Sequence, residues 1–90
     1  MRGVINMQVV IYKTSDCPRC RALAAHLRGL GIDFGERDMS AGEVLADLRC
    51  DGVFALSAPI LQVDDGYHES GAIWNGDNLD TEYVRGALKL

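Results

Sequence analysis

The sequence predicts a single α/β domain, in which a four-stranded mixed sheet is flanked by three helices in the order βαβαββα. Short runs rich in β-branched and aromatic residues alternate with segments whose apolar residues recur at helical spacing. A hairpin turn signal joins the last two strands. A chain of 90 residues has room for one hydrophobic core. We therefore treat residues 1–90 as one domain, with residues 1–6 as a candidate N-terminal extension.

The first half of the chain predicts a strand, a helix and a second strand. Residues 7–12 (Met-Gln-Val-Val-Ile-Tyr) are typical of a buried strand. From Pro18 onward, apolar residues recur at helical spacing for about three turns, with the proline suited to the first turn and Gly31 to the C′ position. Residues 32–35 (Ile-Asp-Phe-Gly) then alternate between apolar and polar or small, which predicts a short edge strand, parallel to the first.

The second half predicts a helix, a hairpin and a final helix. Ser40-Ala-Gly-Glu43 matches a capping box and is followed by an apolar stripe at helical spacing. Residues 59–63 (Pro-Ile-Leu-Gln-Val) predict a third strand, and residues 64–66 (Asp-Asp-Gly) predict a turn into a short fourth strand that begins at Tyr67. Residues 75–77 are expected to be a loop. The apolar face of the last helix is predicted to comprise Leu79, Tyr83, Val84 and Leu88.

Composition and charge narrow the classes of partner. The chain is 48% hydrophobic and 24% charged, with a formal net charge of -4. This acidic balance argues against nucleic acid or an anionic membrane as the main partner. The N-terminal run does not match a signal peptide, and no stretch approaches the roughly 20 apolar residues of a spanning helix. We expect a cytoplasmic monomer whose partners are proteins or small molecules.

The close pair of cysteines carries the predicted chemistry. Cys17-Pro-Arg-Cys20 lies between the first strand and the first helix, so the sulfur of Cys17 should lie beside the free amides of the helix N-terminus. A thiolate is stabilised there, which predicts Cys17 as the nucleophile and Cys20, one turn later, as the resolving thiol. Lys13 and Arg19 add positive potential to this surface, whereas Asp16 opposes it.

A metal site is the alternative interpretation of the same pair, with Cys50, His26 or His68 completing a tetrahedral set. No second close pair of ligands follows, and His26 points about 240° around the helix from Cys20. We expect Cys50 to be a small buried hydrophobe and neither histidine to be a ligand. Placement between a strand and a helix favours redox chemistry. A metal or iron-sulfur carrier and a redox-silent binding module stay open as functions of other classes.

The segment from Val9 to Cys20 (Val-Val-Ile-Tyr-Lys-Thr-Ser-Asp-Cys-Pro-Arg-Cys) resembles the opening of glutaredoxins and related thioredoxin-fold proteins. The resemblance implies a thioredoxin-like fold and a thiol-disulfide oxidoreductase that reduces protein or glutathione-mixed disulfides, with no bound cofactor and with glutathione as a candidate reductant. Ser57-Ala58-Pro59 matches the family's cis-proline loop, whose backbone pairs with extended substrate. The substrate surface is then expected to include Lys13, Pro18, Arg19, Ala58 and Pro59.

Glu69 and Ser70 have two interpretations. Their surroundings are similar to the part of glutathione-transferase N-terminal domains in which a Glu-Ser pair holds the γ-glutamyl end of glutathione, which predicts substrate contacts at both residues. The second interpretation, which has equal weight, is that Ser70 caps a helix and Glu69 is a solvated residue at the end of a strand. Ala58-Pro59 and Ser70-Gly71 also resemble the glutaredoxin-like redoxins of ribonucleotide reductase, which take electrons from a thioredoxin reductase. The electron donor therefore stays open between glutathione and a reductase.

Overall fold

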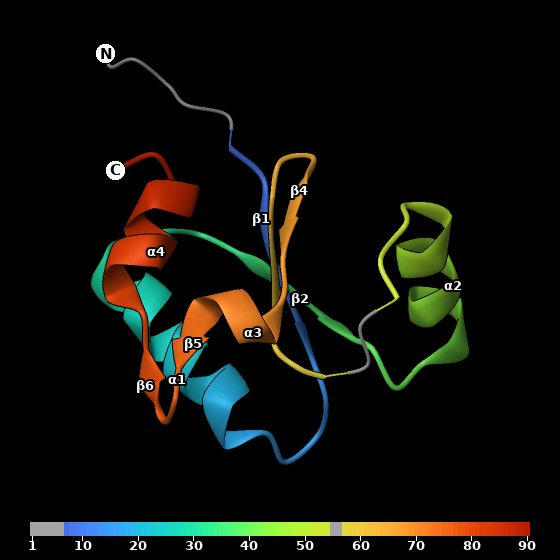
Figure 1. Cartoon of the computed structure of the whole chain (residues 1–90). Coiled ribbons are helices and arrows are strands. Elements are labelled where there is room, and N and C mark those ends of the chain that lie inside the picture. Colours follow the sequence, from blue (N-terminus) through green and yellow to red (C-terminus); the bar gives the residue numbers. More distant parts are fainter. Residues whose placement is uncertain (1–6, 55–56) are drawn as a thin grey trace.

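The computed structural model describes residues 7–54 and 57–90, so the predicted extension at residues 1–6 lies outside the described residues. Figure 1 shows a central sheet with helices packed around it. In chain order the elements are β1 Val9–Lys13, α1 Pro18–Gly29, β2 Gly35–Asp38, α2 Gly42–Cys50, β3 Ile60–Val63, β4 Gly66–His68, α3 Ser70–Ile73, β5 Trp74–Asn75, β6 Asn78–Leu79 and α4 Thr81–Ala87. No described helix has the length and apolar character needed to cross a membrane.

The sheet is mixed, and its strand order is β2-β1-β3-β4. β1 and β2 are parallel, with Val10 opposite Gly35, whereas β3 runs antiparallel to both β1 and β4. The predicted mixed α/β sheet is therefore confirmed, including the parallel strand-helix-strand unit at its start. The structure adds the one-turn helix α3 and the small β5–β6 hairpin before the last helix.

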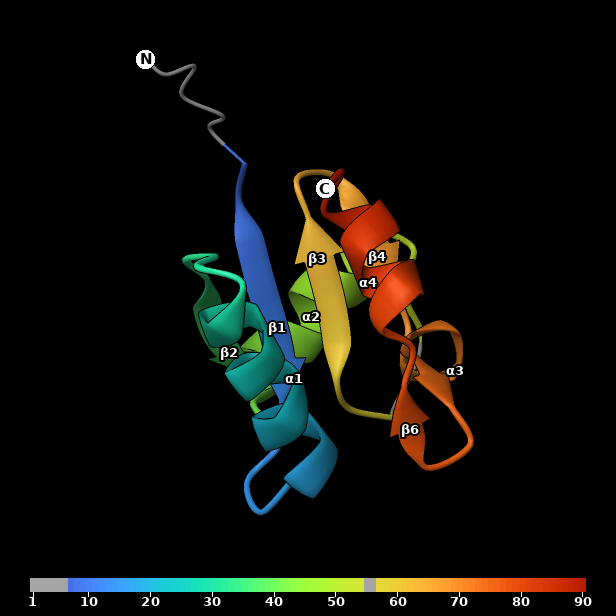
Figure 2. The same ribbon diagram turned by 90° about the vertical axis from the view of Figure 1, so that its left-hand side faces the viewer.

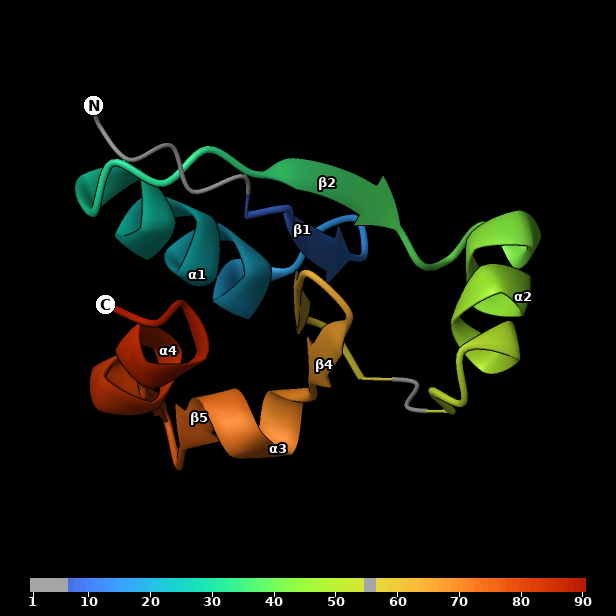
Figure 3. The same cartoon turned by 90° about the horizontal axis from the view of Figure 1, so that it is seen from above.

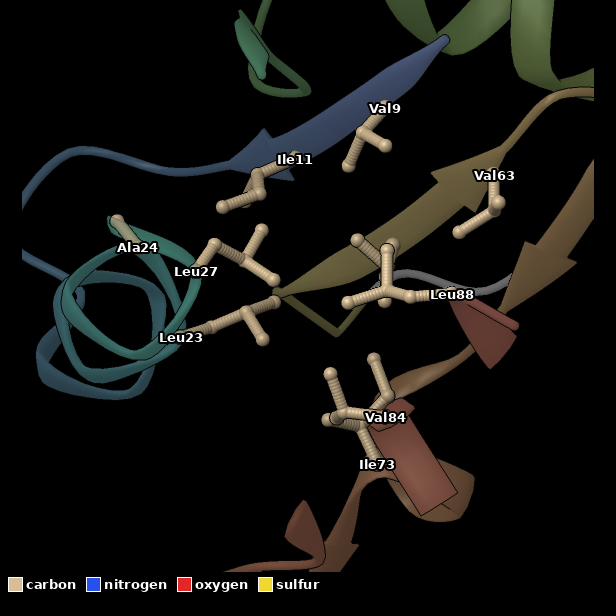
Figure 4. Packing of buried hydrophobic residues seen from close by; sticks show 10 residues of the cluster. Val9, Ile11, Leu23, Ala24, Leu27, Val63, Ile73, Val84 and Leu88 are labelled. Carbon is tan, nitrogen blue, oxygen red and sulfur yellow. The ribbon is translucent and has the colours of Figure 1, made fainter. Parts of the chain in front are cut away.

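Helices cover both faces of the sheet. In Figure 2 and Figure 3, α1 and α4 lie on one face, whereas α2 lies on the other. Side chains of α1 point toward the sheet and toward α4 across the main core (Figure 4). Burying each aliphatic side chain contributes about 1.5–3 kcal/mol to folding. The main core comprises Val9, Ile11, Leu23, Ala24, Leu27, Leu61, Val63, Ile73, Val84 and Leu88.

A smaller core lies on the α2 face of the sheet. Two polar contacts involve residues of this region, from Tyr67 to Asp51 and from Arg37 to Asp47. The first joins β4 to the C-cap residue of α2, and the second joins β2 to the middle of α2. The smaller core comprises Tyr12, Met39, Val44, Leu48, Val53 and Ile60.

The second strand begins later than the sequence predicts. Its pairing with β1 starts at Gly35, whereas the alternation of residues 32–35 predicts a strand over that segment. Gly31, at a φ of 73°, follows the end of α1, and the amide of Ile32 donates to the carbonyl of Leu27 at 3.0 Å. The apolar residues of this segment pack against the main core as partly buried side chains. Their alternation reflects this contact, so the predicted strand position is wrong.

Helix α2 begins without the predicted capping box. Its N-cap residue is Ala41, which makes no side-chain cap bond. The Ser40 hydroxyl instead donates to a carboxylate oxygen of Asp38 at 2.6 Å, and the Ser40 amide donates to the same oxygen at 2.9 Å. These bonds lower the pKa of Asp38. The prediction is wrong because a nearby carboxylate competes for the serine hydroxyl.

Two predictions about burial also fail. Cys50 is exposed. It lies two positions beyond buried Leu48, and therefore about 200° around the helix. In the C-terminal region Val84 is buried as predicted, but Tyr83 is 38% exposed. Leu79 belongs to β6 and not to the last helix.

Candidate functional site

The two cysteines of the Cys-Pro-Arg-Cys motif form a disulfide at the start of α1, with their Cα atoms 5.2 Å apart. Cys17 is the N-cap residue, and its Sγ accepts a hydrogen bond from the backbone N–H of Cys20 at 3.1 Å. Pro18 occupies the first helical position, where the missing amide hydrogen costs nothing. The sulfur of Cys17 thus lies at the positive end of the helix dipole, which stabilises negative charge there.

The two sulfurs differ in their access to solvent. Cys17 is half-buried, whereas Cys20 is only 3% exposed. A disulfide of another molecule can therefore approach Cys17 but not Cys20. This asymmetry suits attack by Cys17 and resolution by Cys20.

A small charged cavity lies beside the pair. It has a volume of about 170 Å³, and both cysteines line it. The predicted positive charge of Lys13 and the opposing charge of Asp16 both belong to this cavity. Its remaining lining residues are Thr14, Ser15, Arg21 and Glu36.

A larger cleft brings together residues from distant parts of the chain. It has a volume of about 410 Å³, and Arg19, Ala58 and Ser70 line it together. The peptide bond between Ala58 and Pro59 is cis, and the proline is fully buried immediately before β3. The other lining residues are Ser57, Gly71, Trp74 and Gly76, which the sequence did not single out as cleft residues.

Glu69 and Ser70 take different positions at the start of α3. Ser70 is buried, and its hydroxyl donates to the carbonyl of Ala58 at 3.5 Å. The predicted helix cap at Ser70 is wrong, because Ser70 is the first residue of α3 and Glu69 is the N-cap. Glu69 is exposed, makes no side-chain cap bond and does not line the larger cleft.

The glutaredoxin family model matches residues 9–49. This match supports membership of the glutaredoxin family. The match runs from β1 almost to the end of α2 and includes the Cys17–Cys20 pair. Together with the disulfide-forming pair, the match supports a thiol-disulfide oxidoreductase. No curated protein matches the chain.

Neither histidine has a hydrogen bond to the cysteine pair in the part of the chain that the structure describes. His68 shares a hydrogen bond of 2.9 Å with the Tyr83 hydroxyl, and burial lowers its pKa. The Nε2 atom of His26 is buried and has no hydrogen-bond partner among the residues that the structure describes. Within residues 7–54 and 57–90, no three His, Cys, Asp or Glu side chains form a group that could hold a metal ion.

Arg19 has partners that the sequence did not reveal. Its side chain extends to the β5–β6 hairpin, where it meets Trp74, Gly76 and Asp77. These partners lie more than 50 positions further along the chain. The sequence predicted only a loop at residues 75–77, and loop composition carries no signal for a contact with one particular arginine.

Proposed function

We propose that the protein reduces disulfides through a dithiol cycle, in which Cys17 attacks and Cys20 resolves. The observation that carries the proposal is the half-buried Cys17 at the N-terminus of α1, with the buried Cys20 close enough to form a disulfide with it. Local peptide dipoles favour the thiolate of Cys17, which is the reactive form in disulfide exchange.

The chemistry divides into two exchanges. The thiolate of Cys17 attacks one sulfur of the substrate disulfide, so that a mixed disulfide forms and the other half of the substrate leaves as a thiolate. The Cys20 thiol then loses its proton to water and attacks Sγ of Cys17, which releases the second substrate thiolate. Two electrons pass from the protein to the substrate, and the protein is left with the 17–20 disulfide. Two thiols from a reductant restore the starting state.

The substrate surface of the proposal lies around the larger cleft. Ala58 and Pro59 would present backbone to an extended protein substrate, while Lys13 and Pro18 flank the reacting sulfur. Arg19 and Ser70 would meet polar groups of the substrate within the cleft. Glu69, which is exposed at the start of α3, would accept a hydrogen bond from an ammonium group of glutathione.

Glutathione is the proposed electron donor, and the cleft lined by Arg19 and Ser70 supports this, because both side chains carry donors for carboxylates. A thioredoxin reductase-type donor is the second candidate, favoured by the resemblance of Ser70-Gly71 to the redoxins of ribonucleotide reductase. In either case the protein acts as an electron carrier in cell redox homeostasis. We place it in the cytoplasm as a monomer without a bound cofactor.

The redox state of the 17–20 pair across a series of glutathione buffers tests the proposal, with thiols trapped by alkylation and counted by mass. Rapid equilibration at about -200 to -230 mV, with a glutathione adduct on the Cys20→Ser variant, supports glutathione as the donor. Slow exchange, with a potential of about -270 mV, supports a reductase as the electron donor instead. A pair that never changes its redox state in these buffers contradicts both.

Two functions of other classes, a metal or iron-sulfur carrier and a redox-silent binding module, would each give a different experimental result. A metal or iron-sulfur carrier would show bound zinc or visible absorption after anaerobic purification. A redox-silent binding module would give no mixed disulfide on the Cys20→Ser variant. Either result would replace the dithiol cycle.

A further inference from the structure

Arg19 reaches away from the cysteine pair and docks on the β5–β6 hairpin. Its Nη2 donates to the carbonyl oxygen of Gly76 at 3.1 Å and lies 3.7 Å from a carboxylate oxygen of Asp77. Its guanidinium lies over the Trp74 ring, with Cζ 4.9 Å from the ring centroid. Three residues of one hairpin therefore contact a side chain that belongs to the redox motif.

The same guanidinium keeps unused donors at the cleft. Both polar contacts of Arg19 use Nη2, while Nε and Nη1 donate to none of the residues that the structure describes. The side chain is 45% exposed and lines the cleft of about 410 Å³ together with Ala58 and Ser70. A planar guanidinium with free donors matches the two oxygens of a carboxylate better than any other side chain does.

Asp77 is a weak partner for Arg19. Its carboxylate is fully exposed, at 104% of the reference area, and the 3.7 Å separation is too long for a hydrogen bond. Exposed ion pairs of this kind contribute little to stability. The Gly76 carbonyl and the Trp74 ring hold the Arg19 side chain in position, whereas another anion can replace the Asp77 carboxylate beside the guanidinium.

We infer that Arg19, positioned by the β5–β6 hairpin, binds a carboxylate of the disulfide substrate, and that Asp77 competes with this carboxylate for the guanidinium. The inference rests on the proposed function, because it names the substrate class of the same cleft. That class is disulfides that carry a carboxylate near the reacting sulfurs. The carboxylate belongs either to a glutathione moiety or to an acidic residue of a protein substrate, and the chemistry of recognition is the same.

Three small disulfides that differ mainly in charge test the inference: anionic dithiodipropionate, neutral hydroxyethyl disulfide and cationic cystamine. Reduced protein is mixed with each in single turnover, quenched with acid, alkylated and read by mass. Each rate is divided by the rate of the same disulfide with free dithiothreitol, which removes intrinsic reactivity. The quantity of interest is the ratio of the anionic to the neutral rate.

The variants are expected to change this ratio in opposite directions. Arg19→Gln lowers it about tenfold, since hydrogen bonds to charged groups are worth that much or more. Arg19→Lys lowers it less, because the ammonium keeps the charge but loses the planar fork. Asp77→Asn raises it about two- to threefold, in line with a weak exposed pair. Glu82→Gln, an exposed residue at the start of α4, makes the same charge change as Asp77→Asn and should leave the ratio unchanged.

The outcomes separate the inference from the function beneath it. If the protein reduces none of the three disulfides, the proposed function fails. If it reduces them but Arg19→Gln leaves the ratio unchanged, or slows all three equally, the inference fails and the function stands. Two further substrates identify the source of the carboxylate, glutathione disulfide and a disulfide peptide with glutamate or glutamine beside its cysteine. A loss in Arg19→Gln confined to glutathione disulfide assigns the carboxylate to glutathione, and one confined to the glutamate peptide assigns it to protein substrates.

Discussion

The two faces of the sheet each carry a cysteine at the end of a helix, and the comparison between them explains where the chemistry lies. Cys17 precedes the first turn of α1 on the face with the larger core. Cys50 is the last residue of α2 on the face with the smaller core, and it is the more exposed of the two. The N-terminal end of a helix favours a thiolate, whereas the C-terminal end disfavours one. On the proposed function, position on the helix should therefore matter more for reactivity than exposure does.

Removing each thiol in turn gives the largest expected difference between the faces. Cys17→Ser should lose all measurable disulfide reduction, because no other accessible sulfur occupies the start of α1. Cys20→Ser should complete the first exchange and stop at a stable mixed disulfide. Cys50→Ser should keep the activity of the unaltered protein. Single-turnover assays with mass detection check all three, and loss of activity in Cys50→Ser would overturn the comparison.

The two cores can be compared by matched truncations of fully buried leucines. Leu27→Ala on α1 and Leu48→Ala on α2 each remove one side chain that is at most 1% exposed. Both should cost about 2–5 kcal/mol of unfolding free energy, measured by urea denaturation. Leu27→Ala should cost more, since Leu27 belongs to the larger of the two clusters. A larger cost at Leu48 would show that the α2 face is the more tightly packed.

A polar contact on the α2 face gives a smaller effect. The Tyr67 hydroxyl donates to an Asp51 carboxylate oxygen at 2.5 Å, and burial together with this bond raises the pKa of Tyr67. Tyr67→Phe should cost about 1 kcal/mol, because the bond has a charged acceptor but lies at the exposed rim. The folded state favours the neutral hydroxyl, so its contribution is complete below the unfolded pKa of about 10 and is lost as the pH rises.

Alkaline titration of stability tests this assignment. The free energy of unfolding of the unaltered protein should fall above about pH 10. The free energy of unfolding of the Tyr67→Phe variant should fall less steeply over the same range. An unchanged slope in the variant would assign the fall to another group. Disulfide reduction at neutral pH should be the same in both proteins, because Tyr67 lines neither cavity at the redox site.

The smallest expected effect is an acid dependence from His68. Burial lowers the pKa of His68, so the neutral imidazole is favoured in the folded state. The unfolded state binds the proton more readily, and stability should therefore be complete above about pH 6.5 and fall as the pH falls below it. His68→Gln should flatten this part of the curve. Tyr83→Phe removes the same hydrogen bond but keeps the imidazole, so it should retain the slope.

The sequence predicted the elements whose signals are local. The β-branched run of β1, the proline at the start of α1 and the turn at residues 64–66 each determine structure within a few positions, and all three lie where they were expected. The Cys17–Cys20 pair is of the same kind, because the spacing of the motif alone brings the two sulfurs within reach of each other.

The predictions that failed depend on contacts between parts of the chain. The alternation of residues 32–35 comes from packing on α1 and not from strand pairing. The exposure of Cys50 depends on which side of α2 faces the sheet. The apolar stripe of this helix is too short to predict that orientation. The partners of Arg19 and the carbonyl that receives the Ser70 hydroxyl belong to elements that only the completed fold brings together.

The most direct test of the account is the alkylation rate of each cysteine in one reduced sample at neutral pH, kept reduced with a phosphine and read peptide by peptide. Cys17 should react about tenfold faster than Cys50, or more, although Cys50 is the more exposed, because the rate follows the thiolate fraction. Equal rates, or a faster reaction at Cys50, would mean that the start of α1 does not activate its sulfur, and the assignment of Cys17 as the nucleophile would fail.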